Sequence, residues 1–222
     1  MFFNSRRSSV LSKRGMVATS QPLAAVAGLK MLMNGGNAVD AAVAAAAALA
    51  VVEPMSTGIG GDAFSLIWMA KEKKVHALNA SGRAPQAASV DELVGKGLTE
   101  IPATSPYSVS IPGTVDGWID IVDKYGTMPI SEVLEPAIHY AESGFPVSEL
   151  IAFQWAEGMV KLNQFPSGRE LSINGEAPRH GQTVCLPELG KVLRNIAEGG
   201  RDAFYRGEVA QKIANFIQQI GG

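Results

Sequence analysis

The sequence predicts an α+β fold in which helices predominate. Residues 38–52 are almost wholly Ala, Val and Leu between an asparagine cap and a proline, a pattern typical of a buried helix. Further segments carry apolar residues at helical spacing, whereas only residues 63–70 and 75–80 have the pattern of neighbouring strands. Because a two-stranded sheet is marginal by itself, we expect other elements to extend or cover this one.

The apolar helix expected over residues 38–52 has clear start and stop signals. Gly35 and Gly36 end the preceding segment, because glycine readily adopts the left-handed backbone that terminates helices. Asn37 can cap the new helix, and Asp40 places a carboxylate in the first turn, where the helix dipole favours it. The helix is too short and too rich in alanine to predict a membrane span.

The N-terminal part divides into an arm and the first elements of a domain. We expect residues 1–14 to form a flexible arm and residues 15–222 to form a single domain, since no repeat or low-complexity linker divides them. Residues 16–20 alternate in the manner of a short strand. Pro22 opens a helix that extends to Asn34, because proline is favoured in the first turn and apolar residues then recur at helical spacing.

A hairpin and a series of helices account for the remaining elements. Strands 63–70 and 75–80 flank a charged turn and predict an antiparallel hairpin. Residues 101–112 are rich in proline and are expected to be irregular, as are residues 163–186. The expected helices cover residues 90–97, 113–125, 131–143, 148–162, 187–197 and 207–220, with Ser89, Ser131 and Ser148 as caps.

Composition excludes several classes of function. The 222 residues carry a formal net charge of −2 at pH 7, which argues against nucleic acid or an acidic surface as the main partner. The single cysteine, Cys185, excludes an internal disulfide framework and is expected to be a packed, inert thiol. The basic start of the chain lacks the apolar run of a secretory signal. We therefore expect a cytoplasmic protein that binds neither nucleic acid nor membrane.

No constellation of residues in the sequence predicts a complete catalytic centre. His76, His139 and His180 show no metal-ligand spacing with Cys185, and we expect structural or surface roles for them. The glycine-rich run at 58–61 precedes a strand and lacks the Gly-Lys-Ser/Thr of a phosphate loop. We therefore assign no catalytic residue, no metal site and no cofactor to this chain.

Long stretches of the chain resemble the gamma-glutamyltransferase family. They are residues 16–64, the IPGTVDGW run at 111–118 and the DKYGTM run at 123–128. The resemblance implies the αββα sandwich of the N-terminal nucleophile hydrolases, of which this chain supplies the helix-rich large-chain part. In that family a precursor cleaves itself, and the threonine at the new N-terminus of the small chain attacks the gamma-glutamyl amide.

The resemblance also implies partners. A small chain of the same precursor would carry the nucleophilic threonine, so this chain alone is expected to be inactive and to assemble into a heterodimer or a dimer of heterodimers. Because the two chains share the central sheets in that family, we expect the isolated chain to bury the helix at 38–52 poorly. The implied substrates are gamma-glutamyl amides such as glutathione, or other amides with a carboxylate-bearing acyl group.

Arg83 is the residue that we expect to bind substrate. It follows a strand in a short Gly-Arg-Ala-Pro loop, where a guanidinium can bind a carboxylate through two parallel hydrogen bonds; a solvated surface arginine is the alternative. By resemblance, the transferases carry a carboxylate-binding arginine two residues further from the Ala-Pro pair, at the position of Ser81. The position of Arg83 is instead similar to a divergent branch that includes acylases acting on glutaryl side chains.

Three hypotheses about function follow from these observations. The first is the large chain of a gamma-glutamyltransferase-like hydrolase, and the second is a glutaryl or beta-lactam side-chain acylase of the same superfamily. The third is a scaffold module without catalytic activity.

Asp62 also departs from the family, since transferases usually have glycine there, and we expect its carboxylate to cap the turn.

Overall fold

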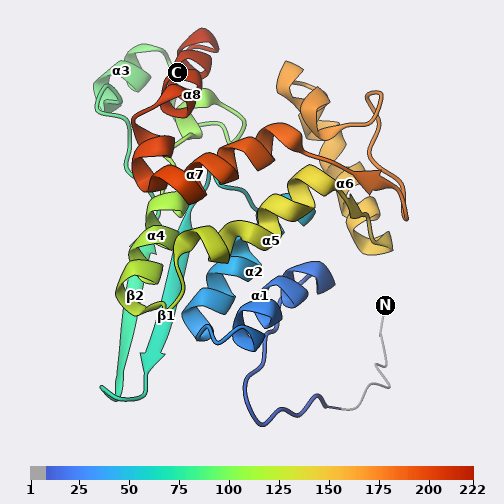
Figure 1. Ribbon diagram of the computed structural model, residues 1–222. Coiled ribbons are helices and arrows are strands. Elements are labelled where there is room, and N and C mark those ends of the chain that lie inside the picture. The colour runs from blue at the N-terminus through green and yellow to red at the C-terminus, as the bar shows by residue number, and fades with distance from the viewer. Residues whose placement is uncertain (1–8) are drawn as a thin grey trace.

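A row of helices forms the body of the protein (Figure 1). The computed structural model describes residues 9–222, with the backbone alone at residues 166 and 167. Four helices pack side by side in the order α1 (Pro22–Met33), α2 (Ala38–Val52), α5 (Ile130–Ser143) and α7 (Pro187–Tyr205). A fifth helix, α4 (Thr114–Tyr125), lies between α7 and an antiparallel hairpin of β1 (Ala63–Met69) and β2 (Lys74–Ala80).

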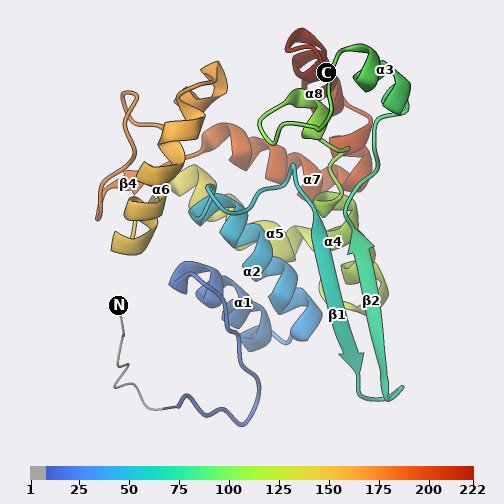
Figure 2. The same cartoon turned by 180° about the vertical axis from the view of Figure 1, so that it is seen from behind.

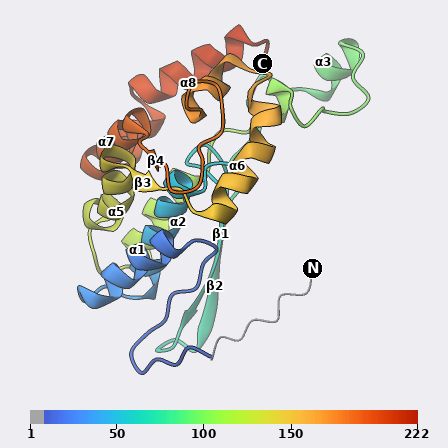
Figure 3. The same ribbon diagram turned by 90° about the vertical axis from the view of Figure 1, so that its right-hand side faces the viewer.

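The remaining elements lie around this body. Helix α3 has no buried residue and stands apart from the helix row (Figure 3). The elements around the body are α3 (Val90–Gly95), α6 (Glu149–Leu162), α8 (Glu208–Gln219), the 3₁₀ turns η1 (Pro106–Ser108) and η2 (Pro166–Leu171), and a small sheet of β3 (Phe145–Pro146) and β4 (Thr183–Val184). Within residues 9–222, no helix combines the length and the apolar character that a membrane crossing needs.

Helix α2 is the centre of the core and has the bounds expected from the sequence. Its alanines are small enough to let α1 and α5 approach on either side, so Ala44, Ala47 and Ala48 are fully buried. The expectation that the isolated chain covers this helix poorly was wrong. The cover comes from neighbouring helices of the same chain, not from the sheet that we expected to be incomplete.

A buried carboxylate ties the start of α2 to the loop between α4 and α5. Asp40 is 0% exposed, and its carboxylate accepts hydrogen bonds from the backbone N–H of Asn37 at 2.7 Å and of Thr127 at 3.0 Å. The hydroxyl of Thr127 donates a further bond to it at 2.7 Å. Asn37 caps the helix as expected and completes a capping box with Asp40.

The hairpin covers α4 with one face and leaves the other face open (Figure 2). Residues that point toward the helices are half-buried, whereas their neighbours along each strand are exposed, as the alternation of a strand requires. The exposed face is apolar and joins Phe64, Leu66, Trp68 and Val75, which are between 51% and 79% exposed. We call these four residues the outer hairpin face.

Several expected elements differ from the structure near the ends of the chain. Residues 16–20 form no strand, because no strand of the described part of the chain offers them backbone partners. Residues 9–14 form neither helix nor strand, and the rest of the expected arm, residues 1–8, lies outside the described part. The helix break expected from the glycine pair at 199–200 is present, since the backbone at Gly200 is not helical and has φ of 63°. The difference is that residues 201–205, which were expected to form no helix, add a last turn to α7 after this kink.

Two further differences concern the middle of the chain. Ser131 is not a cap, because α5 begins one residue earlier and has Pro129 at its N-cap. The sequence also gave no indication of the sheet of β3 and β4, where Phe145 pairs with Val184. These strands are two residues long, so their formation depends on a distant partner and not on a local pattern.

Candidate functional site

The glycine-rich loop before β1 lies against the start of α4. The carbonyl oxygen of Gly61 accepts hydrogen bonds from the backbone N–H groups of Gly113 at 3.0 Å and Thr114 at 3.1 Å. Gly113 is the N-cap of α4 and has no side chain that could satisfy the free N–H groups of the first turn. The Gly61 carbonyl therefore takes over part of the capping and fixes the glycine loop on α4.

The turn after β2 is bonded to the segment that leads into α4. The Ile111 N–H donates to the carbonyl of Arg83 at 2.9 Å, and the Ser110 hydroxyl donates to the carbonyl of Ser81 at 3.4 Å. Gly82 lies between them with φ of 73°, a conformation that favours glycine. A Cβ at Gly82 would also collide with the carbonyl oxygen of Ile111. The backbone that carries Arg83 is thus held tightly against residues 110–111.

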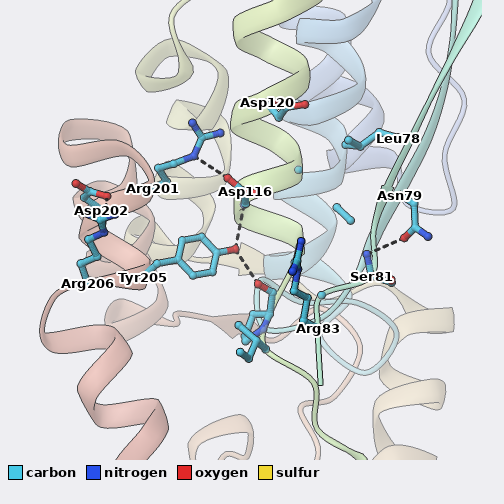
Figure 4. A pocket seen from close by; sticks show the side chains of 16 residues that line it. Leu78, Asn79, Ser81, Arg83, Asp116, Asp120, Arg201, Asp202, Tyr205 and Arg206 are labelled. Atoms are coloured by element: carbon cyan, nitrogen blue, oxygen red, sulfur yellow. Dashed lines mark hydrogen bonds and ion pairs between the residues drawn. The ribbon is translucent and has the colours of Figure 1, made fainter. Parts of the chain in front are cut away.

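A cleft of about 700 Å³ opens beside these segments (Figure 4). Its walls come from the end of β2, the start of α4 and the end of α7. Arg83 lines it, and so does Ser81, the position at which the resemblance places the arginine of the transferases. The other polar side chains that line the cleft are Asn79, Asp116, Asp120, Arg201, Asp202, Tyr205 and Arg206.

Arg83 differs from the other charged side chains of the cleft in its pairing. The others are engaged in ion pairs: Arg201 with Asp116 at 2.6 Å, Arg206 with Asp202 at 3.4 Å, and Asp120 with Lys124 at 2.7 Å. Among residues 9–222, no carboxylate pairs with the guanidinium of Arg83, which is exposed and lies between Asp116 and Ser81 in Figure 4. An unpaired guanidinium of this kind can bind a carboxylate through two parallel hydrogen bonds.

Tyr205 joins the end of α7 to the start of α4. Its hydroxyl donates to the carbonyl of Pro112 at 2.8 Å and accepts from the N–H of Asp116 at 3.1 Å (Figure 4). Its ring makes an edge-on contact with the buried Phe204, at 5.0 Å between ring centroids. Burial raises the pKa of the Tyr205 hydroxyl above its ordinary value of 10.0.

Two of the singled-out residues differ from expectation. Asp62 is exposed, and no group within residues 9–222 donates to its carboxylate, so the expected cap is not formed there. Cys185 is exposed and not packed. The reason is that Val184 and Leu186 on either side of it face the core, and the side chain between them therefore points outward.

The three histidines lie apart from one another. His76 connects the hairpin to α4, since its ring nitrogens lie 2.7 Å from Oε2 of Glu72 and 3.1 Å from the hydroxyl of Tyr125. His139 contacts Ser143 on the same helix at 3.3 Å, and His180 is exposed. In the part of the chain that the structure describes, no three His, Cys, Asp or Glu side chains are grouped to hold a metal ion.

The α7 wall of the cleft is the part that sequence reasoning missed. Arg201, Tyr205 and Asp116 were not singled out as site residues. The available signal was the RDAFYRG run at 201–207, which places charged and aromatic residues directly after a pair of helix-breaking glycines. Such a run indicates a helix end that turns, but it does not say which element the turned end contacts.

Solved structures show the class of protein to which this fold belongs. The chain is similar to the gamma-glutamyltranspeptidase of Helicobacter pylori, with a TM-score of 0.89 and 33% identity over 97% of this chain and 63% of that chain. It is also similar to the cephalosporin acylase of Bacillus halodurans, with a TM-score of 0.87 and 39% identity over 100% of this chain and 44% of that chain. The expected α+β class is confirmed: the chain is the helix-rich large-chain part of an N-terminal nucleophile hydrolase.

The family follows from the sequence comparisons. A family model described as gamma-glutamyltranspeptidase matches residues 24–222. The glutathione hydrolase proenzyme of Bacillus subtilis (strain 168) is 36% identical over 216 residues, which are 96% of this chain. The chain therefore belongs to the gamma-glutamyltranspeptidase family. It spans 37% of the length of that curated relative.

Proposed function

We propose that this chain is the large-chain part of an enzyme that cleaves amides whose acyl group bears a carboxylate, with gamma-glutamyl amides such as glutathione as the first candidates. The observation that carries the proposal is the pairing of charges in the cleft. The other charged side chains there are neutralised by neighbours, whereas Arg83 has no ion-pair partner within residues 9–222. A carboxylate of the substrate supplies the missing partner.

The proposed chemistry divides the work between two chains. The nucleophile is the N-terminal threonine of a small chain, whose free amine acts as the general base. The large chain, which alone would be inactive, binds the carboxylate end of the acyl group at Arg83 and so directs the scissile amide toward that threonine. The name of the Bacillus subtilis relative, a glutathione hydrolase proenzyme, supports an origin of both chains in one precursor.

A second candidate function is that of an acylase for glutaryl-type side chains. Its support is the position of the arginine, directly before Ala84-Pro85 and not at Ser81, together with the 39% identity to a cephalosporin acylase. Arg83 and Ser81 line the same cleft, so an arginine at either position reaches the same space from a different starting point. A glutaryl group keeps the terminal carboxylate and lacks only the alpha-amino group of a glutamyl group.

Three anilides test the proposal on the assembled protein, both chains included. Gamma-glutamyl anilide and glutaryl anilide each carry the carboxylate and differ in the alpha-amino group, whereas butyryl anilide lacks the carboxylate. We expect kcat/KM to be highest for one of the two carboxylate-bearing anilides, and the preference between them separates the transferase from the acylase. Equal rates on all three would contradict the proposal, and no hydrolysis of any would favour the scaffold hypothesis.

The outer hairpin face is the surface that we propose for the small chain. Phe64, Leu66, Trp68 and Val75 form a continuous apolar surface on a sheet of only two strands, and such a sheet needs further cover to be stable. We assign this surface to the small chain because the 222-residue chain spans only 37% of the length of its relative. The larger part of such a protein is therefore available to pack on the outer hairpin face.

A charge placed on this face should prevent assembly. Leu66→Lys puts an ammonium group where an apolar partner must pack, and we expect the yield of assembled protein to fall at least tenfold in co-expression followed by size-exclusion chromatography. Val90→Lys is the matched control, since Val90 is similarly exposed, at 77% against 79%, but lies on α3. Equal assembly of both variants would show that the small chain binds elsewhere.

A further inference from the structure

The start of α4 obtains part of its cap from another helix, beside the part that the Gly61 carbonyl supplies. Gly113 offers no side chain, and the Asp116 N–H in the first turn donates instead to the hydroxyl of Tyr205 on α7. The kink at Gly200, with φ of 63°, interrupts α7 before its last turn and leads that turn to α4. The same hydroxyl donates to the carbonyl of Pro112, so one side chain fixes both the helix start and the segment before it.

This segment is in direct contact with the backbone of Arg83. Ile111, next to Pro112, donates its N–H to the Arg83 carbonyl at 2.9 Å. The two backbone segments are packed closely, because a Cβ at Gly82 would collide with the carbonyl of Ile111 and a Cβ at Gly113 would collide with the carbonyl of Ala80. A shift of residues 111–113 must therefore displace the turn that carries Arg83.

We propose that Tyr205 is a positioning residue for substrate binding: it locks residues 111–113 in place and thereby sets the direction of the Arg83 guanidinium in the cleft. The inference rests on the proposed function, in which Arg83 binds the acyl carboxylate. Two features support it beyond the hydrogen bonds. Tyr205 itself lines the cleft, and its ring packs edge-on against the buried Phe204.

A merely structural role makes a different prediction. If Tyr205 only joins α7 to α4, loss of its hydroxyl lowers stability and affects all substrates alike. If it positions Arg83, the loss raises KM for carboxylate-bearing substrates and leaves kcat and the carboxylate-free substrate nearly unchanged. Tyr140 is the matched control, because its half-buried hydroxyl also donates to a backbone carbonyl of another helix, that of Leu23, at 3.2 Å.

The experiment compares Tyr205→Phe with Tyr140→Phe in the assembled protein. For the better of gamma-glutamyl and glutaryl anilide, we expect Tyr205→Phe to raise KM roughly 5- to 30-fold, as the loss of two hydrogen bonds implies, with butyryl anilide unaffected. Tyr140→Phe should change neither KM. In the Arg83→Ala background, Tyr205→Phe should have no further effect on KM. Tyr205→Met, which also lacks the hydroxyl but keeps a long apolar side chain, should raise KM in the same way and replaces the Phe variant if that one does not assemble.

The outcomes separate this inference from the function on which it rests. If Arg83→Ala leaves the preference for a carboxylate intact, the proposed function fails, and the positioning role fails with it. If Arg83→Ala abolishes the preference but Tyr205→Phe changes KM no more than Tyr140→Phe does, Arg83 keeps its role and the positioning inference is overturned. Additive effects of the two substitutions would overturn it as well.

Discussion

Removal of the Asp40 carboxylate should cost the protein a large part of its stability. Asp40→Ala leaves three partly buried backbone donors without an acceptor, the N–H groups of Asn37, Thr127 and Met128, and deprives the Thr127 hydroxyl of its bond at 2.7 Å. Each unsatisfied buried donor costs about 1–3 kcal/mol. Partial relaxation of the loop lowers the sum, so we expect a loss of about 3–5 kcal/mol in the free energy of unfolding.

The measurement is urea-induced unfolding of the assembled protein, with Asp40→Asn and Asp123→Ala beside Asp40→Ala. Asp40→Asn keeps the side-chain volume and one acceptor oxygen, and should lose about half as much stability. Asp123 is an exposed carboxylate on α4, and its removal should change the free energy of unfolding by about 0.5 kcal/mol or less. A loss in Asp40→Ala no larger than that in Asp123→Ala would refute the central role of this carboxylate in joining α2 to the loop after α4.

Two further predictions concern the backbone near Arg83 and the behaviour at alkaline pH. Gly82→Ala should lower the free energy of unfolding by about 2–4 kcal/mol, because it adds a collision with Ile111 to the cost of a positive φ. Gly97→Ala, also at positive φ but with open space around it, should cost only about 1 kcal/mol. Thermal unfolding of both variants measures the difference, and equal losses would argue against the tight contact. Burial raises the pKa of Tyr140 and Tyr205 above 10.0, so the stability they contribute is complete below pH 10 and is lost as the pH rises further. Tyr140→Phe should therefore flatten the decline of stability above pH 10 measured by urea unfolding, and an unchanged decline would contradict the assignment.

Local signals account for most of the elements that could be predicted. The bounds of α2 follow from Asn37 and Pro54, which act on the helix ends through their own side chains. The hairpin follows from alternation on both sides of a charged turn. By contrast, the pairing of Phe145 with Val184 joins residues distant in sequence, and no property of either segment indicates it. The expected cytoplasmic location stays a prediction.

The site could be predicted only in part, for a similar reason. Arg83 was recognisable from its loop and from the family resemblance. Its lack of an ion-pair partner within residues 9–222 was not recognisable, because it depends on how Asp116 and Asp202 are paired. Their partners are Arg201, on the turned end of α7, and Arg206, directly after it. The kink at Gly200 brings this end to the cleft, and its direction is set by packing.

The central claim is that Arg83 binds the carboxylate of the acyl group, and substitution of Arg83 tests it most directly. The measurement is kcat/KM of the assembled protein on paired anilides with and without the carboxylate. The proteins compared are wild type, Arg83→Ala, Arg83→Lys and the control Arg179→Ala, which removes an equal charge from an exposed loop. A charge-assisted contact at a side chain as exposed as Arg83 is worth about 1.5–3 kcal/mol, so Arg83→Ala should lose roughly 10- to 150-fold on the carboxylate-bearing substrate alone. Arg83→Lys should recover part of this loss, since an ammonium group lacks the planar fork of donors. An equal loss on both substrates, or a loss no greater than that of Arg179→Ala, would show that Arg83 is a structural or surface residue.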